Sequence, residues 1–156
     1  MNENTQPNDQ VLMDNFETFK QTVDESGLFL LDGLQLEFRN NTGTVFIPTF
    51  IQYMMEDLVN ELSDILSVNI LYQTKSMDGD MARVVVYSMP YSDQMFVIDI
   101  ESVQYGIVDG ISVTFFNSID IMLGCLENIL DSLQQNTVEI VKEQPKVQLY
   151  KIFFCS

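Results

Sequence analysis

The sequence predicts an α+β fold in which an antiparallel sheet of about seven to nine strands packs one face against two or three amphipathic helices. Three observations lead to this prediction. Two long segments, 49–66 and 117–133, repeat apolar residues at helical spacing. Short β-branched segments lie between and around them, and several are separated by Asp-Gly turn signals. The length of 156 residues suits a single domain at 9–156, preceded by a flexible polar tail at 1–8.

The first periodic segment predicts a helix from about Asp9 to Ser26. Its apolar residues recur at steps of four, three and four, at Leu12, Phe16, Phe19 and Val23. Gly27 suits the position just after a helix, where a left-handed backbone is common. This segment should therefore pack one stripe against the sheet.

Three short strands are expected after this helix. Residues 28–31 and 34–38 flank an Asp-Gly dipeptide at 32–33, which predicts a hairpin. Residues 44–47 predict the third strand, and Pro48 should end it because proline cannot donate to a strand ladder.

The strongest helix is expected at 49–66. Thr49 and Gln52 have the spacing of a capping box. One face is apolar at helical spacing, with Ile51, Met54, Met55, Leu58, Leu62, Ile65 and Leu66. The rest of the chain predicts strands at 68–73, 83–87, 95–100, 138–141 and 147–154, a hairpin of 103–108 with 111–115 around Asp109-Gly110, and a helix at 117–133.

The two long helical segments match at an offset of 68 residues. The pairs include Ile51 with Ile119, Leu58 with Leu126, Val45 with Val113 and Ile70 with Val138. One interpretation is a duplicated strand–helix–strand unit with pseudo-two-fold symmetry. The alternative is that any two amphipathic helices between strands can be matched in this way.

The charge is strongly negative. The chain has 23 Asp and Glu against 7 Lys and Arg, a formal net charge of −16. Residues 40–74 and 84–141 contain no basic residue, whereas Lys142, Lys146 and Lys151 lie near the C-terminus. Because binding to phosphates needs Lys and Arg, this distribution argues against direct nucleic-acid or membrane binding. The acidic surface either attracts a basic protein or serves solubility alone.

The sequence offers little for catalysis. It contains no histidine, which removes the commonest general base and metal ligand. Cys125 and Cys155 lack the surroundings of a reactive thiol, and the carboxylates of Asp78-Gly79-Asp80 lack the spacing of a calcium loop. We therefore expect no enzyme activity, no catalytic residue, no metal and no cofactor. Without a signal-peptide pattern or a long apolar run, the expected location is the cytoplasm of a bacterium or an infected host cell.

The leading hypothesis is a non-catalytic acidic protein that inhibits or neutralises a basic partner. The partner would be a nuclease or a nucleic-acid-binding effector, and the protein an immunity protein or DNA mimic. The outer faces of the two long helices should carry two acidic rows that form the binding surface. These candidate residues are Glu56, Asp57, Glu61, Asp64, Asp120, Glu127 and Asp131.

Two other classes remain open. The order of elements from about Asp9 to Leu133 is similar to that of class I type III secretion chaperones, which implies a small acidic protein, usually dimeric, that binds an extended client. The two strands expected after the last helix depart from that order. The other class is a structural subunit whose strand at 147–154 pairs with a partner. A homodimer is compatible with either class.

Overall fold

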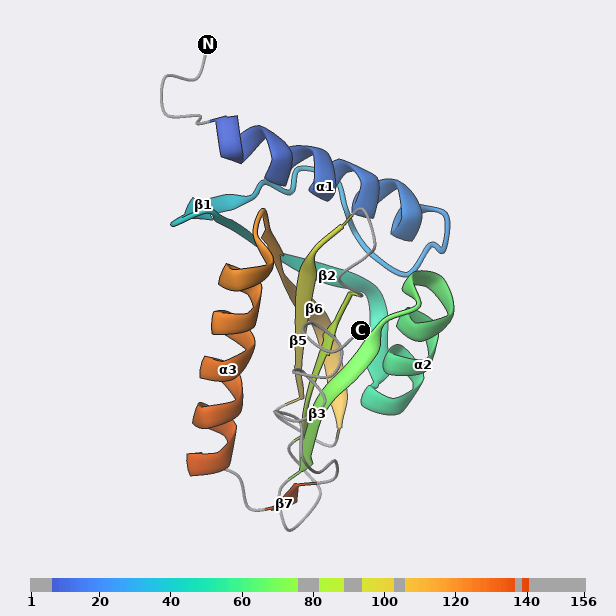
Figure 1. Cartoon of the computed structure of the whole chain (residues 1–156). Helices are drawn as coiled ribbons and strands as arrows, with labels where there is room; N and C mark the ends of the chain where they lie inside the picture. Colours follow the sequence, from blue (N-terminus) through green and yellow to red (C-terminus); the bar gives the residue numbers. More distant parts are fainter. Residues whose placement is uncertain (1–6, 76–81, 89–93, 103–105, 137–138, 141–156) are drawn as a thin grey trace.

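The computed structural model describes residues 7–75, 82–88, 94–102, 106–136 and 139–140. In this part of the chain it has an α+β fold, in which three helices pack on an antiparallel sheet (Figure 1). The elements follow the order α1 (Pro7–Asp24), β1 (Glu37–Arg39), β2 (Thr42–Met54), α2 (Met55–Leu66), β3 (Asn69–Lys75), β4 (Ala82–Tyr87), β5 (Phe96–Ser102), β6 (Ile107–Phe116), α3 (Ile119–Asn136) and β7 (Glu139–Ile140).

Helix α1 confirms the N-terminal helix, two residues earlier at each end than the sequence predicts. Pro7 starts it, because the fixed backbone of proline suits the first helical position. Pro7 and Asn8 are therefore helical rather than part of the expected tail, and the remainder of that tail lies outside the described residues. Gly27 follows the helix with a φ of 72°, the left-handed conformation expected there.

The strands form one sheet in the order β1-β2-β6-β5-β4-β3-β7, with antiparallel pairing between neighbours. Six of these strands have three or more residues, and β7 adds two residues beside β3. The predicted range of seven to nine strands stays unconfirmed, because the strand expected at 147–154 lies outside the described residues.

The helices cover both faces of the sheet, so the prediction that all of them pack on one face is wrong (Figure 1). Helices α1 and α2 share one core cluster, whereas α3 belongs to a second cluster. The cause is visible in β4. Val84 and Val86 join the first cluster, and Val85 and Tyr87 join the second. A strand that is apolar on both sides must be covered on both sides.

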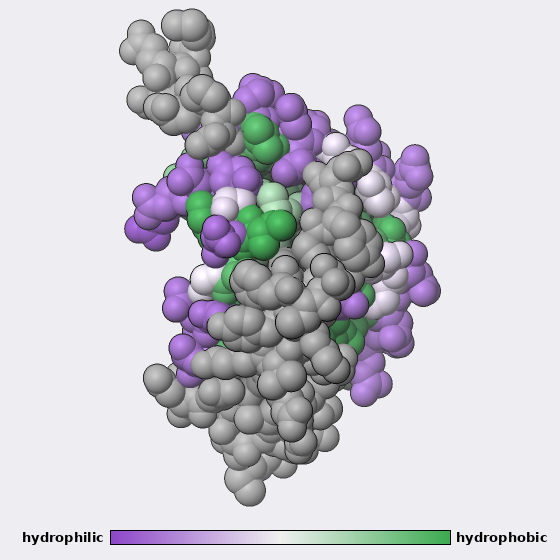
Figure 2. All heavy atoms as spheres, in the orientation of Figure 1, coloured by the Kyte–Doolittle hydropathy of each residue, from purple (hydrophilic) through white to green (hydrophobic). Residues whose placement is uncertain are grey.

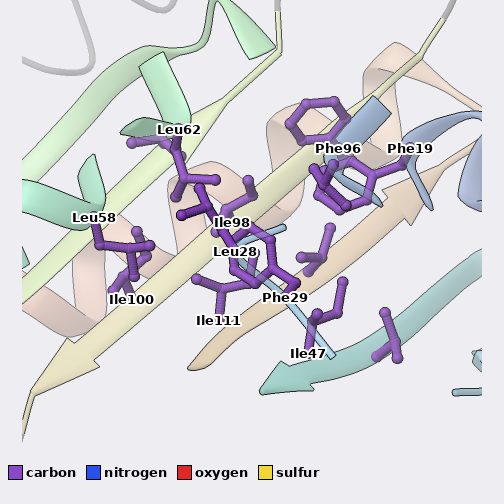
Figure 3. Close-up of a cluster of buried hydrophobic side chains, with 14 of the residues drawn as sticks. Phe19, Leu28, Phe29, Ile47, Leu58, Leu62, Phe96, Ile98, Ile100 and Ile111 are labelled. Atoms are coloured by element: carbon purple, nitrogen blue, oxygen red, sulfur yellow. The ribbon is translucent and has the colours of Figure 1, made fainter. Parts of the chain in front are cut away.

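The larger core lies between the sheet and the helices α1 and α2 (Figure 3). Leu58 and Leu62 of α2 are fully buried there beside Ile98 and Ile100 of β5. Phe19 of α1 meets Phe96 edge-on, with 5.3 Å between ring centroids. Burial of each such side chain contributes roughly 1.5–3 kcal/mol, so this cluster holds α1 and α2 to the sheet.

The predicted helix at 49–66 is wrong in its first six residues. Strand β2 continues through them to Met54, and α2 begins at Met55. Ile51 and Met54, expected in the core, are 57% and 51% exposed. Sheet pairing outweighs the helical pattern here, because the Phe50 amide donates to the Leu28 carbonyl at 2.7 Å.

Pro48 does not end its strand, contrary to the prediction. Its carbonyl accepts a hydrogen bond from the Leu30 amide at 2.9 Å, and it lies opposite Gly110 in the ladder. The proline is accommodated because the ladder uses only its carbonyl acceptor at this position.

The hairpin expected around 32–33 is also wrong. The turn is present, but Phe29 instead forms a bridge with Thr49.

The second predicted hairpin is a single strand. Asp109-Gly110 was expected to turn the chain, yet both residues lie inside β6, next to the irregularity in its pairing with β2. The pseudo-two-fold repeat is not confirmed either. An axis that related antiparallel β2 and β6 would keep α2 and α3 on one face, whereas they lie on opposite faces.

Candidate functional site

Helix α2 carries a row of exposed carboxylates, as predicted. Asp57, Glu61 and Asp64 follow one another at steps of four and three residues, which places them on one side of the helix. Glu56 is also exposed, and the row extends about 12 Å along the axis. No ion pair reaches these four carboxylates from the described residues. Hydrophilic side chains line the outer side of α2 in Figure 2.

Helix α3 carries the second row. Asp120, Glu127 and Asp131 are exposed at steps of seven and four residues, opposite the buried Met122. The placement of the two helices separates the rows, because α2 and α3 pack on opposite faces of the sheet. The seven candidate residues are therefore on the surface but do not form one continuous site.

A third acidic region, missed by the sequence analysis, lies on the sheet itself. Among the described residues, helix α3 covers Val97 and Phe116 but not the other end of this sheet face. A hollow of about 380 Å³ lies there. We call it the sheet hollow, and it is lined by Phe46, Asp99, Glu101, Ile107, Asp109, Gly110 and Ser112.

One guanidinium group already occupies the edge of this region. The Arg83 Nε donates to Asp99 Oδ1 at 2.9 Å, and a terminal nitrogen of Arg83 donates to Asp99 Oδ2. The same Nε lies 3.2 Å from Glu101 Oε1. The hydrogen bonds to Asp99 and the two negative charges raise the pKa of Arg83 above its ordinary value, although burial opposes them.

The aromatic ring of Phe46 lies against Gly110 of the neighbouring strand. A side chain at Gly110 would place its Cβ 2.6 Å from Phe46 Cζ and 2.6 Å from the Ile47 backbone oxygen, so glycine suits this position. Phe46 nevertheless remains 55% exposed, and Ile107 is 37% exposed. The sheet hollow therefore presents an aromatic ring and an aliphatic side chain to solvent beside its carboxylates.

Asp109 is held in place by the irregular part of β2. The Gln52 side-chain amide donates to Asp109 Oδ1 at 2.8 Å. The Thr49 hydroxyl donates to the Asp109 backbone carbonyl at 3.0 Å. Both contacts come from residues of β2 that were expected to begin a helix. The Gln52 contact orients the Asp109 carboxylate, and the Thr49 contact holds its backbone.

Further along β2 the surface is apolar. Phe50 is 66% exposed, and Ile51 and Met54 are each more than half exposed. Large exposed apolar side chains on a folded chain can mark an interaction site where they gather into a patch. The helical spacing that includes Ile51 and Met54 predicted that both would be buried in a helix at 49–66. The structure instead places them in β2.

The chemistry of the remaining groups is limited. Burial raises the pKa of the Cys125 thiol, and the charge of Asp99 raises it further, so this thiol is poorly suited to act as a nucleophile. Among the described residues, no three Asp, Glu or Cys side chains group closely enough to hold a metal ion. Asp78-Gly79-Asp80 lies outside the described residues. No described helix is long and apolar enough to span a membrane.

Comparisons with known proteins add no family to this description. No protein-family model, no curated protein and no solved structure matches the chain. Function must therefore be inferred from the residues themselves.

Proposed function

We propose that this chain is a non-catalytic acidic binding protein of the immunity or DNA-mimic type, which inhibits a basic nuclease or nucleic-acid-binding effector in the cytoplasm of a bacterium or an infected host cell. The observation that carries the proposal is the row of four exposed carboxylates on α2 with no ion pair from the described residues. Such carboxylates compete with phosphates for Lys and Arg through charge-assisted hydrogen bonds.

The opposite placement of the two helices restricts this proposal. A flat basic surface can meet the row on α2 or the row on α3, but not both at once. We favour α2, because it displays four carboxylates between Glu56 and Asp64, whereas α3 displays three between Asp120 and Asp131 over a longer distance. The net charge of −16 would speed the encounter with a cationic partner in either case.

The test compares two matched triple variants. Asp57→Asn, Glu61→Gln and Asp64→Asn remove two Asp charges and one Glu charge from α2. Asp120→Asn, Glu127→Gln and Asp131→Asn remove two Asp charges and one Glu charge from α3. Each purified protein is immobilised and used to capture proteins from the native cell or its infected host, and bound proteins are eluted with salt. The captured enzyme is then assayed for nucleic-acid cleavage or binding with and without the acidic protein.

The proposal expects a basic nucleic-acid enzyme that elutes with rising salt and is inhibited by the wild type and the α3 variant, but much less by the α2 variant. Each lost charge contact should weaken binding by a few-fold at low salt. Equal capture by all three proteins at low and physiological salt would overturn it. Inhibition lost only in the α3 variant would move the interface to α3.

A secretion or assembly chaperone is the second candidate, and the exposed apolar side chains of β2 favour it. A chaperone would bind an extended apolar client with little dependence on salt, and it could act as a homodimer. Replacing Phe50 and Ile51 with Ser separates the two candidates, because client binding would be lost while salt-dependent binding of a basic enzyme would remain.

A further inference from the structure

We infer that the sheet hollow is a socket for one basic side chain, an arginine or a lysine, of a protein partner. This inference rests on the proposed function, since it assumes a basic partner. It adds a specific pocket on the sheet, away from the helix α2 row, that would anchor the partner.

The charge of the hollow selects a cation. Asp99, Glu101 and Asp109 line it, and Arg83 contacts two of these carboxylates. Three negative charges against one positive charge leave a formal charge of −2 for the group. A carboxylate or phosphate ligand would be repelled, and the nearby Arg83 is already committed to Asp99.

Arg83 also shows how this face binds a guanidinium. Its fork meets both oxygens of Asp99, with Glu101 beside it. Glu101 stays 59% exposed despite this contact, and it also lines the hollow. Asp109, oriented by Gln52, supplies a second acceptor from the neighbouring strand. A partner's cation would therefore meet carboxylates on two strands.

The apolar residues of the lining favour a basic side chain over a bare metal ion as the occupant of the hollow. Divalent cations prefer sites made of oxygen ligands, whereas Phe46 and Ile107 supply an aromatic ring and a methyl-bearing surface. An arginine or lysine has an aliphatic stem that can cover apolar surface and a charged head that can lie over a ring. The volume of about 380 Å³ is at the lower end of ligand sites, roughly 300–1,000 Å³, which suits a side chain better than a large cofactor.

The experiment uses the full chain and a defined probe. A capped nona-arginine peptide is titrated into protein carrying labelled isoleucine methyl groups, and a citrulline peptide of equal length provides the uncharged control. The Ile107 methyl group reports on the hollow, whereas Ile119, which is 39% exposed on α3, reports on a similar surface elsewhere. We expect the Ile107 signal to shift more than the Ile119 signal with the arginine peptide, and neither signal to shift with the citrulline peptide.

Two conservative variants then test the lining. Phe46→Leu keeps an apolar side chain without the ring, and Asp109→Asn removes the charge while its oxygen can still accept from Gln52. Each should weaken peptide binding about two- to fivefold at low salt. Asp120→Asn on α3 is the matched control and should change binding less than Asp109→Asn does. Phe46 is more than half exposed, so its replacement should leave thermal unfolding almost unchanged.

The outcomes separate this inference from the proposed function. If the peptide binds but the Ile107 signal and both lining variants are unaffected, the socket is wrong while an acidic interface elsewhere survives. If the arginine peptide does not bind even at low salt, both the socket and the charge argument for a basic partner are overturned.

Discussion

Arg83 on β4 reaches diagonally across the sheet to Asp99 on β5, instead of pairing mainly with Glu101, its direct partner in the strand register. The diagonal contact has two hydrogen bonds, and both side chains are about one-quarter exposed. Glu101 makes a single contact of 3.2 Å and is 59% exposed. The two carboxylates therefore differ in how strongly they depend on Arg83.

Replacing Arg83 with Met should lower the free energy of unfolding by about 1–2 kcal/mol, because Asp99 loses two charge-assisted hydrogen bonds in a partly buried position. Glu101→Gln should change it by less than about 0.5 kcal/mol, since exposed ion pairs contribute little. Urea unfolding followed by circular dichroism measures both. An equal effect of the two substitutions would contradict the diagonal pair as the main contact.

Gly110→Ala should lower the free energy of unfolding by about 1–3 kcal/mol. Its Cβ would lie 2.6 Å from the Ile47 carbonyl oxygen, which is backbone and cannot move without disturbing β2. Gly124 in α3 is the control, because a Cβ there meets nothing within 4 Å. Gly124→Ala should stabilise the protein by about 0.5–1 kcal/mol, as alanine favours helix. Denaturant midpoints of the two variants should therefore move in opposite directions.

The Cys125 thiol should react slowly with a disulfide reagent at about pH 8. Its pKa is raised by burial and by the charge of Asp99, so the folded chain should react more slowly than the urea-unfolded chain. A Cys155→Ser background leaves one thiol to follow. Asp99→Asn should speed the reaction, whereas Glu101→Gln should not, and the reverse order would contradict the assignment.

The raised pKa of Cys125 also determines the direction in which its contribution to the free energy of unfolding changes with pH. The unfolded thiol ionises near pH 8.5 and the folded thiol at higher pH, so proton loss favours the unfolded state first. The contribution of Cys125 to stability is complete below that pH and declines as pH rises above it. Cys125→Ser should therefore make stability less sensitive to pH above about 8.5, as measured by urea unfolding at several pH values.

Helix α2 should respond differently to the loss of charge at its two ends. Asp64 lies in the last turn, near the negative end of the helix dipole, while Asp57 lies in the first turn. Asp64→Asn should stabilise the protein by about 0.3–1 kcal/mol, and Asp57→Asn should not. Thermal unfolding at low salt distinguishes them. Equal stabilisation would indicate that general charge repulsion outweighs the dipole.

The parts of the fold that depend on local periodicity could be predicted from the sequence. The stripe in α1 at Leu12, Phe16, Phe19 and Val23 is buried as expected. In α3, Leu126 and Leu130 are buried, although Ile119 at its start is exposed. These residues follow a single helical period, so no distant segment is needed to recognise them.

The parts that depend on distant pairing could not be predicted in this way. Ile51, Met54 and Met55 continue the helical spacing of α2, yet the first two belong to a strand because β6 and residues 28–30 pair with it. The sheet face on which α3 packs was also predicted wrongly. The consecutive apolar residues of β4 are a signal of coverage on both faces, and that signal could have placed α3 correctly.

The sheet hollow was missed for the same reason. Asp99 and Glu101 alternate with Ile98 and Ile100, which shows from sequence alone that one face of β5 is acidic. Their meeting with Phe46 and Asp109 depends on β2, β6 and β5 being neighbours, which the sequence pattern does not specify. The exposed acids of α2 and α3 were easier to find because each row lies on one helix.

The pairing of β2 with β6 also determines when the N-terminal half can fold. Thr42 pairs with Phe116 and Met54 with Ile107, so β2 meets this partner only after much of the chain has been synthesised. Until then, its apolar side chains and those of α1 have no complete surface to bury against. Pairing between such distant segments slows folding, and the nascent chain should stay open to chaperones and proteases until β6 leaves the ribosome.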